Sequence, residues 1–265
     1  MTANVLTIAG FDPSGGAGVL ADIKTFAALH CYGVAATSAL TVQNTQGVRA
    51  LMPVPADFLA AQIDALFADI DIAAVKIGML ATRANIETVA RALAAYRPPH
   101  VVLDPVMRAS TGDALATEDL ADAFIRHLAP LITLVTPNLA EAAQLARTPV
   151  PASIDAMRAL AAELCRAGFK AVLVKGGHLD GDDSADLLHD SSGARVFSTP
   201  RVATKNTHGT GCTLASAIAA GLANGLPLPA AVAAAKDYVT QSLAAADTLE
   251  VGRGAGPLQH FRDDR

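Results

Sequence analysis

The strongest chemical signal in the sequence is a glycine-rich segment, K-N-T-H-G-T-G-C-T, at residues 205–213. Gly209 and Gly211 let the backbone turn sharply and expose its N–H groups, and a long apolar helix pattern follows them. A helix that starts there directs its positive dipole end at a bound anion, and Lys205 and His208 lie just before it. This pattern predicts a site for a phosphoryl group in transfer, whose charge lies on its equatorial oxygens. An ordinary glycine-rich helix cap is the alternative interpretation.

Cys212 falls in the first turn of that predicted helix. The helix dipole there favours a thiolate, so we expect a pKa below the usual value of about 8.5 and the fastest alkylation of the three thiols. Packing of a small residue is the competing interpretation. Cys31 and Cys165 have no arranged cluster of basic residues around them and are predicted to be packing residues.

Carboxylates stand where two predicted strands end. Asp104 ends one strand, and Asn138 and Glu141 follow the next. Ligands of an open parallel sheet bind beyond the carboxyl ends of its strands, so these side chains are expected to converge there. Asp104 and Glu141 would hold Mg²⁺ through water beside phosphates. Asn138 and Glu141 also have the spacing of a helix capping box, and that alternative stays open.

Two further polar residues lie at predicted strand ends. Lys175, in V-K-G-G, could pair with phosphates while the glycines leave the approach open, or it could be a solvated strand end. Gln43, in V-Q-N-T, offers one hydrogen-bond donor group and one acceptor. Its amide suits an amino-substituted nitrogen heterocycle, although a turn-stabilising role fits as well.

Two familiar nucleotide-binding patterns are absent. Gly10 and Gly15 have the spacing of a Walker A loop, but Gly16 stands where that loop needs lysine. The Gly209 turn begins like a dinucleotide fingerprint, but Leu214 replaces the last glycine. A dehydrogenase is therefore disfavoured.

Alternating strand and helix patterns must position these residues, and they predict an α/β fold with a mostly parallel sheet covered by helices on both faces. The strands are expected at residues 5–9, 33–41, 74–77, 100–104, 133–135 and 171–175, with an edge hairpin at 185–189 and 194–198. The helices are expected at residues 22–30, 56–69, 82–96, 118–128, 138–146, 153–167, 211–224 and 229–245. We expect one domain over residues 1–265, with a tail after Glu250 that wraps or frays.

Composition limits the class of protein. The 265 residues are 52% hydrophobic and 17% charged, which excludes a disordered chain. The net charge is −5 without a basic stripe, so nucleic acid is not expected as a partner. No apolar run reaches about 18 residues, so no membrane span is expected. The scattered cysteines and the absence of an early basic region predict a cytoplasmic protein.

Several long motifs together resemble hydroxymethylpyrimidine/phosphomethylpyrimidine kinases of thiamine biosynthesis. They are T-I-A-G-x-D-P-S-G-G-A-G at 7–18, V-Q-N-T-x-G at 42–47, K-I-G-M-L at 76–80, T-P-N-L-x-E-A at 136–142, V-K-G-G-H at 174–178 and K-N-T-H-G-T-G-C-T-L at 205–214. The resemblance implies a ribokinase-like fold, often a homodimer, that uses ATP and Mg²⁺. It implies phosphorylation of the hydroxymethyl group of an aminopyrimidine alcohol and then of the monophosphate.

The resemblance also implies roles for individual residues. Hydrogen bonds to the aminopyrimidine would come from Gly10, Asp22 and Gln43, and packing on its faces from Val42 and Met79. The anion hole would be Gly209, Thr210 and Gly211, with Cys212 in the catalytic-base position. Residues serving ATP would be Lys175, Lys205, Thr207, Lys236 and Asn138, beside the metal-side carboxylates Asp104 and Glu141.

The sequence differs from the expected pattern at two positions, and two alternative functions stay open. Cys212 stands where the wider ribokinase-like group has Asp, as is typical of the pyrimidine-kinase branch, and Phe11 replaces an expected small Ser or Thr. A pyridoxal or pyridoxine kinase of the same fold is one rival, because its substrate is also a heteroaromatic alcohol. A non-catalytic pyrimidine-binding sensor is the other.

Overall fold

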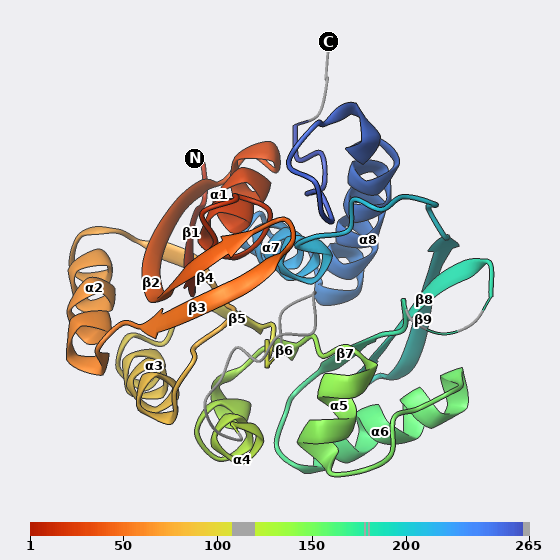
Figure 1. Cartoon of the computed structure of the whole chain (residues 1–265). Coiled ribbons are helices and arrows are strands. Elements are labelled where there is room, and N and C mark those ends of the chain that lie inside the picture. Colours follow the sequence, from red (N-terminus) through yellow and green to blue (C-terminus); the bar gives the residue numbers. More distant parts are fainter. Residues whose placement is uncertain (108–119, 178, 180, 262–265) are drawn as a thin grey trace.

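The computed structural model of the chain describes residues 1–107, 120–177, 179 and 181–261. In this part of the chain nine strands form one sheet, in the order β3-β2-β1-β4-β5-β6-β7-β8-β9 (Figure 1). The strands are β1 (Asn4–Phe11), β2 (Tyr32–Asn44), β3 (Gly47–Pro53), β4 (Ile72–Ile77), β5 (His100–Leu103), β6 (Leu134–Val135), β7 (Val172–Lys175), β8 (Asp183–Asp190) and β9 (Gly193–Pro200).

The centre of the sheet is parallel, and its edges are antiparallel. Neighbouring strands from β2 through β1, β4, β5 and β6 to β7 all pair in parallel. β3 pairs antiparallel with β2, and β8 and β9 form an antiparallel hairpin beside β7. The interior of β1 is buried on both faces, as an apolar run in a parallel sheet requires. The predicted fold class and edge hairpin are therefore confirmed.

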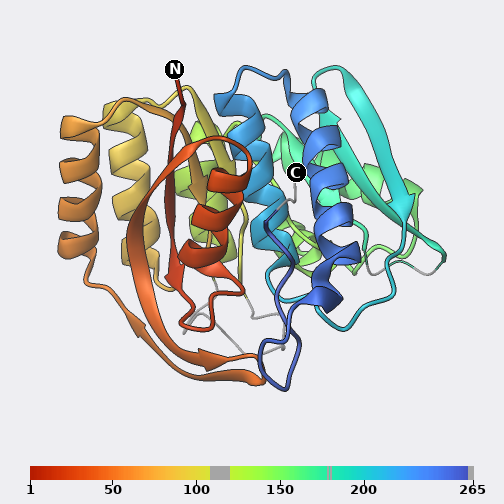
Figure 2. The ribbon, with the colours of Figure 1, turned by 90° about the horizontal axis from the view of Figure 1, so that it is seen from above.

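Helices cover both faces of the sheet (Figures 1 and 2). Side chains alternate between two cores along each strand, so Leu6 and Ile8 enter one core and Val5 the other. The first core is covered by α2 (Ala56–Asp69), α3 (Arg83–Tyr96), α4 (Ala121–Ala123), α5 (Leu139–Ala146) and α6 (Ile154–Arg166). The second core is covered by α1 (Gly18–Ala28), α7 (Thr210–Ala223) and α8 (Leu228–Ala244). None of the helices in the described ranges is long and apolar enough to cross a bilayer.

The main strand missed by sequence reasoning is β3. Strand β2 continues three residues farther than the pattern suggests, to Asn44, and turns back through Gly47 into β3. Much of this ribbon is exposed, so it lacks the buried apolar run that marks the central strands. Gln43 consequently lies within a strand, and the predicted turn position was wrong.

Two helices also differ from the prediction. α1 begins at Gly18, within the glycine-rich segment that reads as a loop. The expected helix at 118–128 has its first two residues outside the described ranges. Its later part is α4 followed by a π-helical turn at Phe124–Leu128 and a 3₁₀ turn at Ala129–Leu131.

The C-terminal tail wraps back over the second core. After the 3₁₀ turn Ala246–Thr248, Leu258 and His260 are buried. The backbone carbonyl of His260 accepts a hydrogen bond from the Tyr238 hydroxyl at 3.0 Å, and its ring Nε2 lies 3.1 Å from the Thr213 hydroxyl of α7. Burial, with a smaller effect of Lys24, lowers the pKa of His260 to about 4.

This histidine should make folding stability depend on pH. The folded state holds a neutral ring, whereas the unfolded chain binds a proton near pH 6.5, so stability present above pH 6.5 is lost as the pH falls towards 4. The loss amounts to up to about 3 kcal/mol. We expect His260→Gln to flatten the unfolding free energy between these pH values, measured by urea titration. His100→Gln, at a partly exposed ring, is the control, and an unchanged slope in His260→Gln would contradict the burial argument.

Candidate active site

The ends of β5 and β7 meet the N-terminus of α7. Lys175 Nζ donates to Asp104 Oδ1 at 2.7 Å, and Asp104 is nearly fully buried. A Cβ atom on Gly211 would lie 3.0 Å from Lys175 Nζ and 3.5 Å from Asp104 Oδ2. Burial opposes the charge on Lys175, but Asp104 and Glu141 raise the pKa of its ammonium group above the ordinary value. The structure therefore brings a charged pair to the start of α7, a pairing that the sequence analysis does not predict.

Asn138 and Glu141 form a capping box at the start of α5. The Asn138 backbone N–H donates to Glu141 Oε2 at 2.8 Å, and the Glu141 N–H donates to Asn138 Oδ1 at 2.9 Å. The capping interpretation is thus confirmed. Burial raises the pKa of Glu141 to about 7, Lys175 opposes this and Asp104 adds to it, so Glu141 also faces the charged pair. No group of three or more metal-ligating side chains occurs among the described residues.

The glycine-rich turn before α7 packs tightly against the loop after β1. Gly209 has φ +82°, and a side chain there would collide with the Gly16 carbonyl oxygen. Helix α7 begins at Thr210, whose hydroxyl donates to the Thr207 carbonyl at 2.7 Å. The first N–H groups of a helix have no acceptor within the helix, so this turn can receive an anion.

The expected low pKa of the Cys212 thiol is wrong. Burial raises the pKa of its thiol to about 11; Lys76 lowers it, whereas Asp104 and Asp22 raise it further. Desolvation of the thiolate outweighs the helix dipole at this position. Burial also raises the pKa of Cys31 and of Cys165. Cys212 is therefore a neutral thiol at pH 7.

Only some of the predicted substrate-binding residues lie near one another in the structure. Gly10 contacts the Met79 methyl group, and Met79 packs with Ala39 beside the end of β4. Gln43 Oε1 accepts from the Thr41 hydroxyl at 3.2 Å. Val42 is 59% exposed and points to the other face of β2, because neighbouring side chains of a strand alternate. Gly10 and Met79 thus lie against each other, Gln43 lies on the half-buried face of β2 beside Thr41, and Val42 does not join them.

Asp22 is fully buried beneath this region. Lys76 Nζ lies 2.9 Å from both of its carboxylate oxygens, and the Thr7 and Ser216 hydroxyls donate to it at 2.6 and 2.7 Å. Burial alone would lower the pKa of Lys76, but Asp22 raises it well above the usual range. With both oxygens occupied by internal donors, Asp22 acts in this structure as an anchor for surrounding elements.

The other residues predicted to bind ATP lie in two separate parts of the structure. Lys236 is buried and donates to Asp186 Oδ2 at 2.7 Å, while the Gly176 N–H donates to Asp186 Oδ1 at 3.0 Å. This pair therefore supports the loop after β7. Lys205 and Thr207 are exposed in the segment that leads to the glycine turn.

Sequence reasoning missed Asp12 as a site residue. Its carboxylate accepts from the Ser14 backbone N–H at 2.8 Å, from the Ser14 hydroxyl at 2.7 Å and from the Ala17 N–H at 3.0 Å. The signal that could have found it is the D-P-S-G sequence, because Asp favours hydrogen bonds to N–H groups just ahead of it in a turn.

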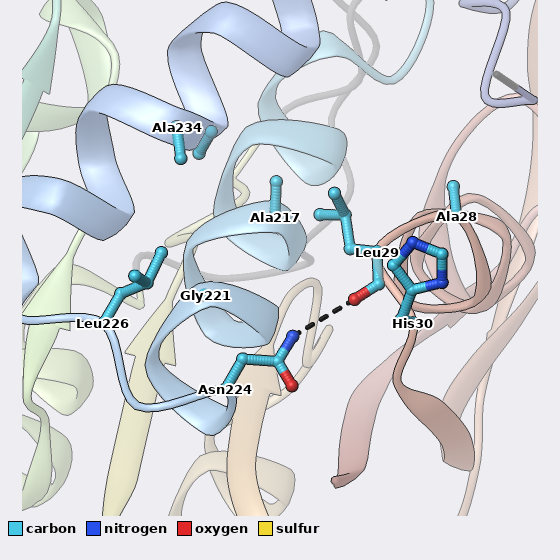
Figure 3. A pocket seen from close by; sticks show the side chains of 9 residues that line it. Ala28, Leu29, His30, Ala217, Gly221, Asn224, Leu226 and Ala234 are labelled. Carbon is cyan, nitrogen blue, oxygen red and sulfur yellow. Dashed lines mark hydrogen bonds between the residues drawn. The ribbon is translucent and has the colours of Figure 1, made fainter. Parts of the chain in front are cut away.

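A cavity of about 150 Å³ lies at the opposite end of α7 from Cys212 (Figure 3). Its wall includes Ala217, Gly221 and Leu226, and Asn224 donates to the Leu29 carbonyl at 3.1 Å beside it. It is remote from the carboxyl ends of the parallel strands and contributes nothing to the arrangement around Lys175.

Comparison with known proteins identifies the family of this chain. The family profile Phosphomethylpyrimidine kinase matches residues 12–259. A hydroxymethylpyrimidine/phosphomethylpyrimidine kinase of Rhizobium meliloti is 49% identical over 261 residues, or 98% of each chain. A solved phosphomethylpyrimidine kinase of Clostridium difficile has a TM-score of 0.81 and 38% identity, over 91% of this chain and 100% of that one.

The fold is shared more widely. The structure of the Staphylococcus aureus pyridoxal kinase in complex with ADP matches with a TM-score of 0.91 and 34% identity, over 100% of this chain and 96% of that one. Because the family profile spans nearly the whole chain, and the Rhizobium relative is 49% identical over 98% of its length, the chain belongs to the phosphomethylpyrimidine kinase family.

Proposed function

We propose that the chain uses ATP to phosphorylate the hydroxymethyl group of 4-amino-5-hydroxymethyl-2-methylpyrimidine and then the monophosphate to the diphosphate, in thiamine biosynthesis. The observation that carries the proposal is the meeting of the Gly209 turn with Lys175 and Asp104. An anion-receiving helix start beside a partly buried lysine suits phosphoryl transfer. The names of the relatives support the pyrimidine, and pyridoxal kinase structures with ADP and AMP-PCP support the nucleotide.

In this proposal the hydroxymethyl oxygen bonds to the γ-phosphorus, and the bond from that phosphorus to the β–γ bridging oxygen breaks. The N–H groups of the Gly209–Gly211 turn receive the equatorial oxygens. Lys175 pairs with the nucleotide phosphates, and Lys236 supports the loop that presents it. Lys205, Thr207 and Asn138 remain proposed contacts on the nucleotide side.

Asp104 and Glu141 fit a hard divalent cation. Both are buried oxygen donors, and together they carry more negative charge than Lys175 balances. Mg²⁺ commonly binds through one or two carboxylates, waters and phosphates, so two carboxylates suffice. When bound, the ion would neutralise charge on the phosphates of ATP.

Cys212 has a restricted role in this proposal. A thiol with a pKa of about 11 is a poor proton acceptor at pH 7 when the acceptor must start as the thiolate. Catalysis of phosphoryl transfer depends mainly on positioning and charge neutralisation, and a weak base suffices. Cys212, as a neutral thiol, then only contacts the attacking hydroxyl, and the hydroxyl proton passes to an oxygen of the transferred phosphoryl group as the phosphorus–oxygen bond forms.

The compartment and assembly are part of the proposal. We propose a homodimer in the cytoplasm. One face of the β2–β3 ribbon exposes Leu40, Val42 and Met52, and Leu40 pairs directly with Met52 across the ribbon. A contiguous exposed apolar face supports burial against a second copy. The three cysteines form no disulfide, which suits a reducing compartment.

Product analysis tests the proposed function. The chain is incubated with ATP, Mg²⁺ and hydroxymethylpyrimidine, in parallel with pyridoxal, and products are identified by mass. We expect the pyrimidine to gain one and then two phosphate groups. Preferential phosphorylation of pyridoxal would favour the related vitamin kinase, and absence of ATP consumption would leave a binding protein without catalysis.

Alkylation of Cys212 tests its raised pKa. We expect the iodoacetamide rate at Cys212, measured by peptide mapping, to be slow at pH 7.5 and to climb up to about pH 11. Cys212→Ser should lower kcat by less than the roughly 10²-fold that general-base catalysis would supply. An alkylation rate that levels off below pH 8, or a far larger loss of kcat, would mean that Cys212 acts as a general base in its thiolate form.

Gln43 is tested by truncating its amide. Losing hydrogen bonds to a buried polar ligand edge costs about 1–3 kcal/mol, so Gln43→Ala should raise the KM for pyrimidine at least fivefold and leave the KM for ATP unchanged. Steady-state kinetics with each substrate varied measures both. Asn44→Ala removes the neighbouring exposed amide as a matched control. Equal KM values in the two variants would remove Gln43 from the substrate site.

Glu141→Gln separates capping from metal binding. The amide keeps an acceptor for the Asn138 N–H but loses the charge. We expect the Mg²⁺ concentration for half-maximal turnover to rise several-fold, with thermal stability nearly retained. Glu163→Gln, at the end of α6 that leads to the start of β7, is the charge-matched control. An unchanged Mg²⁺ requirement would mean that Glu141 serves only as a cap.

A further inference from the structure

His208 joins three segments that surround the proposed substrate site. Its Nε2 lies 2.8 Å from Asp12 Oδ2 in the loop after β1, and 3.3 Å from the Gln43 side-chain nitrogen on β2. Its own residue directly precedes the glycine turn of α7. The ring also packs against Gly16, where any side chain would collide with it. One nearly buried imidazole therefore contacts the loop, the ribbon and the turn.

The backbone around this imidazole is held by the C-terminal tail. The His208 N–H donates to the Gly256 carbonyl at 3.0 Å. The Gly254 N–H donates to the Thr45 hydroxyl at 3.1 Å, close to the tip of the β2–β3 ribbon. Because the same short stretch of tail holds both the ribbon and the turn, the separation between Gln43 and His208 is fixed from outside the site.

Asp12 determines which partner the ring nitrogen can have. Burial would raise the pKa of Asp12, but hydrogen bonds from His208 and Ser14 lower it below the ordinary value, so the side chain is a carboxylate. A carboxylate only accepts hydrogen bonds, and the nitrogen 2.8 Å from it therefore carries a proton. His208 Nε2 thus has one hydrogen, which points to Asp12, and no lone pair with which to accept a hydrogen bond from Gln43.

A donor at this position constrains the Gln43 amide. An amide NH₂ group that faces an imidazole N–H makes no hydrogen bond, because both groups donate. If the amide is turned over from the orientation in which its oxygen accepts from Thr41, that oxygen shares the Nε2 hydrogen of His208 with Asp12, and its NH₂ group donates to the Thr41 hydroxyl, which itself donates to the Phe11 carbonyl at 3.0 Å. The imidazole therefore distinguishes the two orientations of the amide.

We propose that His208, held by Asp12, is a positioning residue that sets the orientation of the Gln43 amide and thereby the donor–acceptor pattern offered to the heterocycle. This inference rests on the proposed function, because it assumes that Gln43 meets the substrate. It assigns His208 to recognition of the heterocycle rather than to the phosphoryl group that its place in the sequence suggests.

A double-mutant cycle tests whether His208 acts through Gln43. His208→Asn should raise the KM for hydroxymethylpyrimidine about three- to tenfold, the range of one hydrogen bond, and leave the KM for ATP unchanged. In the Gln43→Ala background the same change should add almost nothing, because coupled residues are not additive. Independent, multiplying effects on KM would overturn the proposal. His260→Gln removes another buried imidazole that contacts α7 and should combine with Gln43→Ala additively.

A second variant and a measurement without substrate keep the test conclusive if His208→Asn fails to fold or if the proposed function is wrong. Asp12→Asn keeps one acceptor oxygen for Ser14 but places an NH₂ group where Oδ2 faces Ala17 and His208, so the His208 Nε2 proton loses its acceptor, and the variant should reproduce the KM effect. The side-chain NH₂ resonances of Gln43, followed by NMR without substrate, should shift in His208→Asn and Asp12→Asn but not in His260→Gln. Unmoved resonances overturn the positioning role whichever heterocycle is phosphorylated, whereas shifted resonances without pyrimidine turnover would contradict only the proposed function.

Discussion

The buried ion pair between Asp22 and Lys76 is the contact on which the site geometry depends. Asp22 lies on α1 and Lys76 on β4, and the hydroxyls of Thr7 on β1 and Ser216 on α7 complete the carboxylate shell. Removing one partner of such a pair leaves an uncompensated buried charge and costs about 3–5 kcal/mol. This cluster of polar side chains therefore fixes the positions of α1, β1, β4 and α7 relative to one another.

The fixed arrangement of these four elements explains the close backbone contacts that glycines make in the loops beside them. Gly209 can approach the Gly16 carbonyl, and Gly18 the Gly10 carbonyl, only because no side chain intervenes. With α1 and α7 fixed against β1 and β4, the parallel strands bring Asp104 and Lys175 to the same edge. The helix start, the lysine and the carboxylate are thus consequences of one packing arrangement.

Local sequence predicted the parts of the molecule that local forces determine. The buried strands follow from unbroken apolar runs, and the Asn138–Glu141 cap follows from its spacing. The ribbon strand β3 was missed because its exposed residues carry no burial pattern. The anchoring of Asp22, the Asp12–His208 contact and the raised pKa of Cys212 depend on residues far apart in the chain, which no window of sequence brings together.

The charge balance of the site bears on what can bind there. Lys175 pairs with Asp104 and also interacts electrostatically with Glu141, so without a ligand the net charge of these three groups is not positive. A polyphosphate alone would meet two carboxylates for one ammonium group, and the glycine turn supplies only partial charges. Favourable binding therefore requires either protonation of Glu141, whose pKa of about 7 permits it, or a cation that arrives with the phosphates. The second route leaves Lys175 able to exchange Asp104 for a phosphate oxygen, since the cation then compensates the carboxylate.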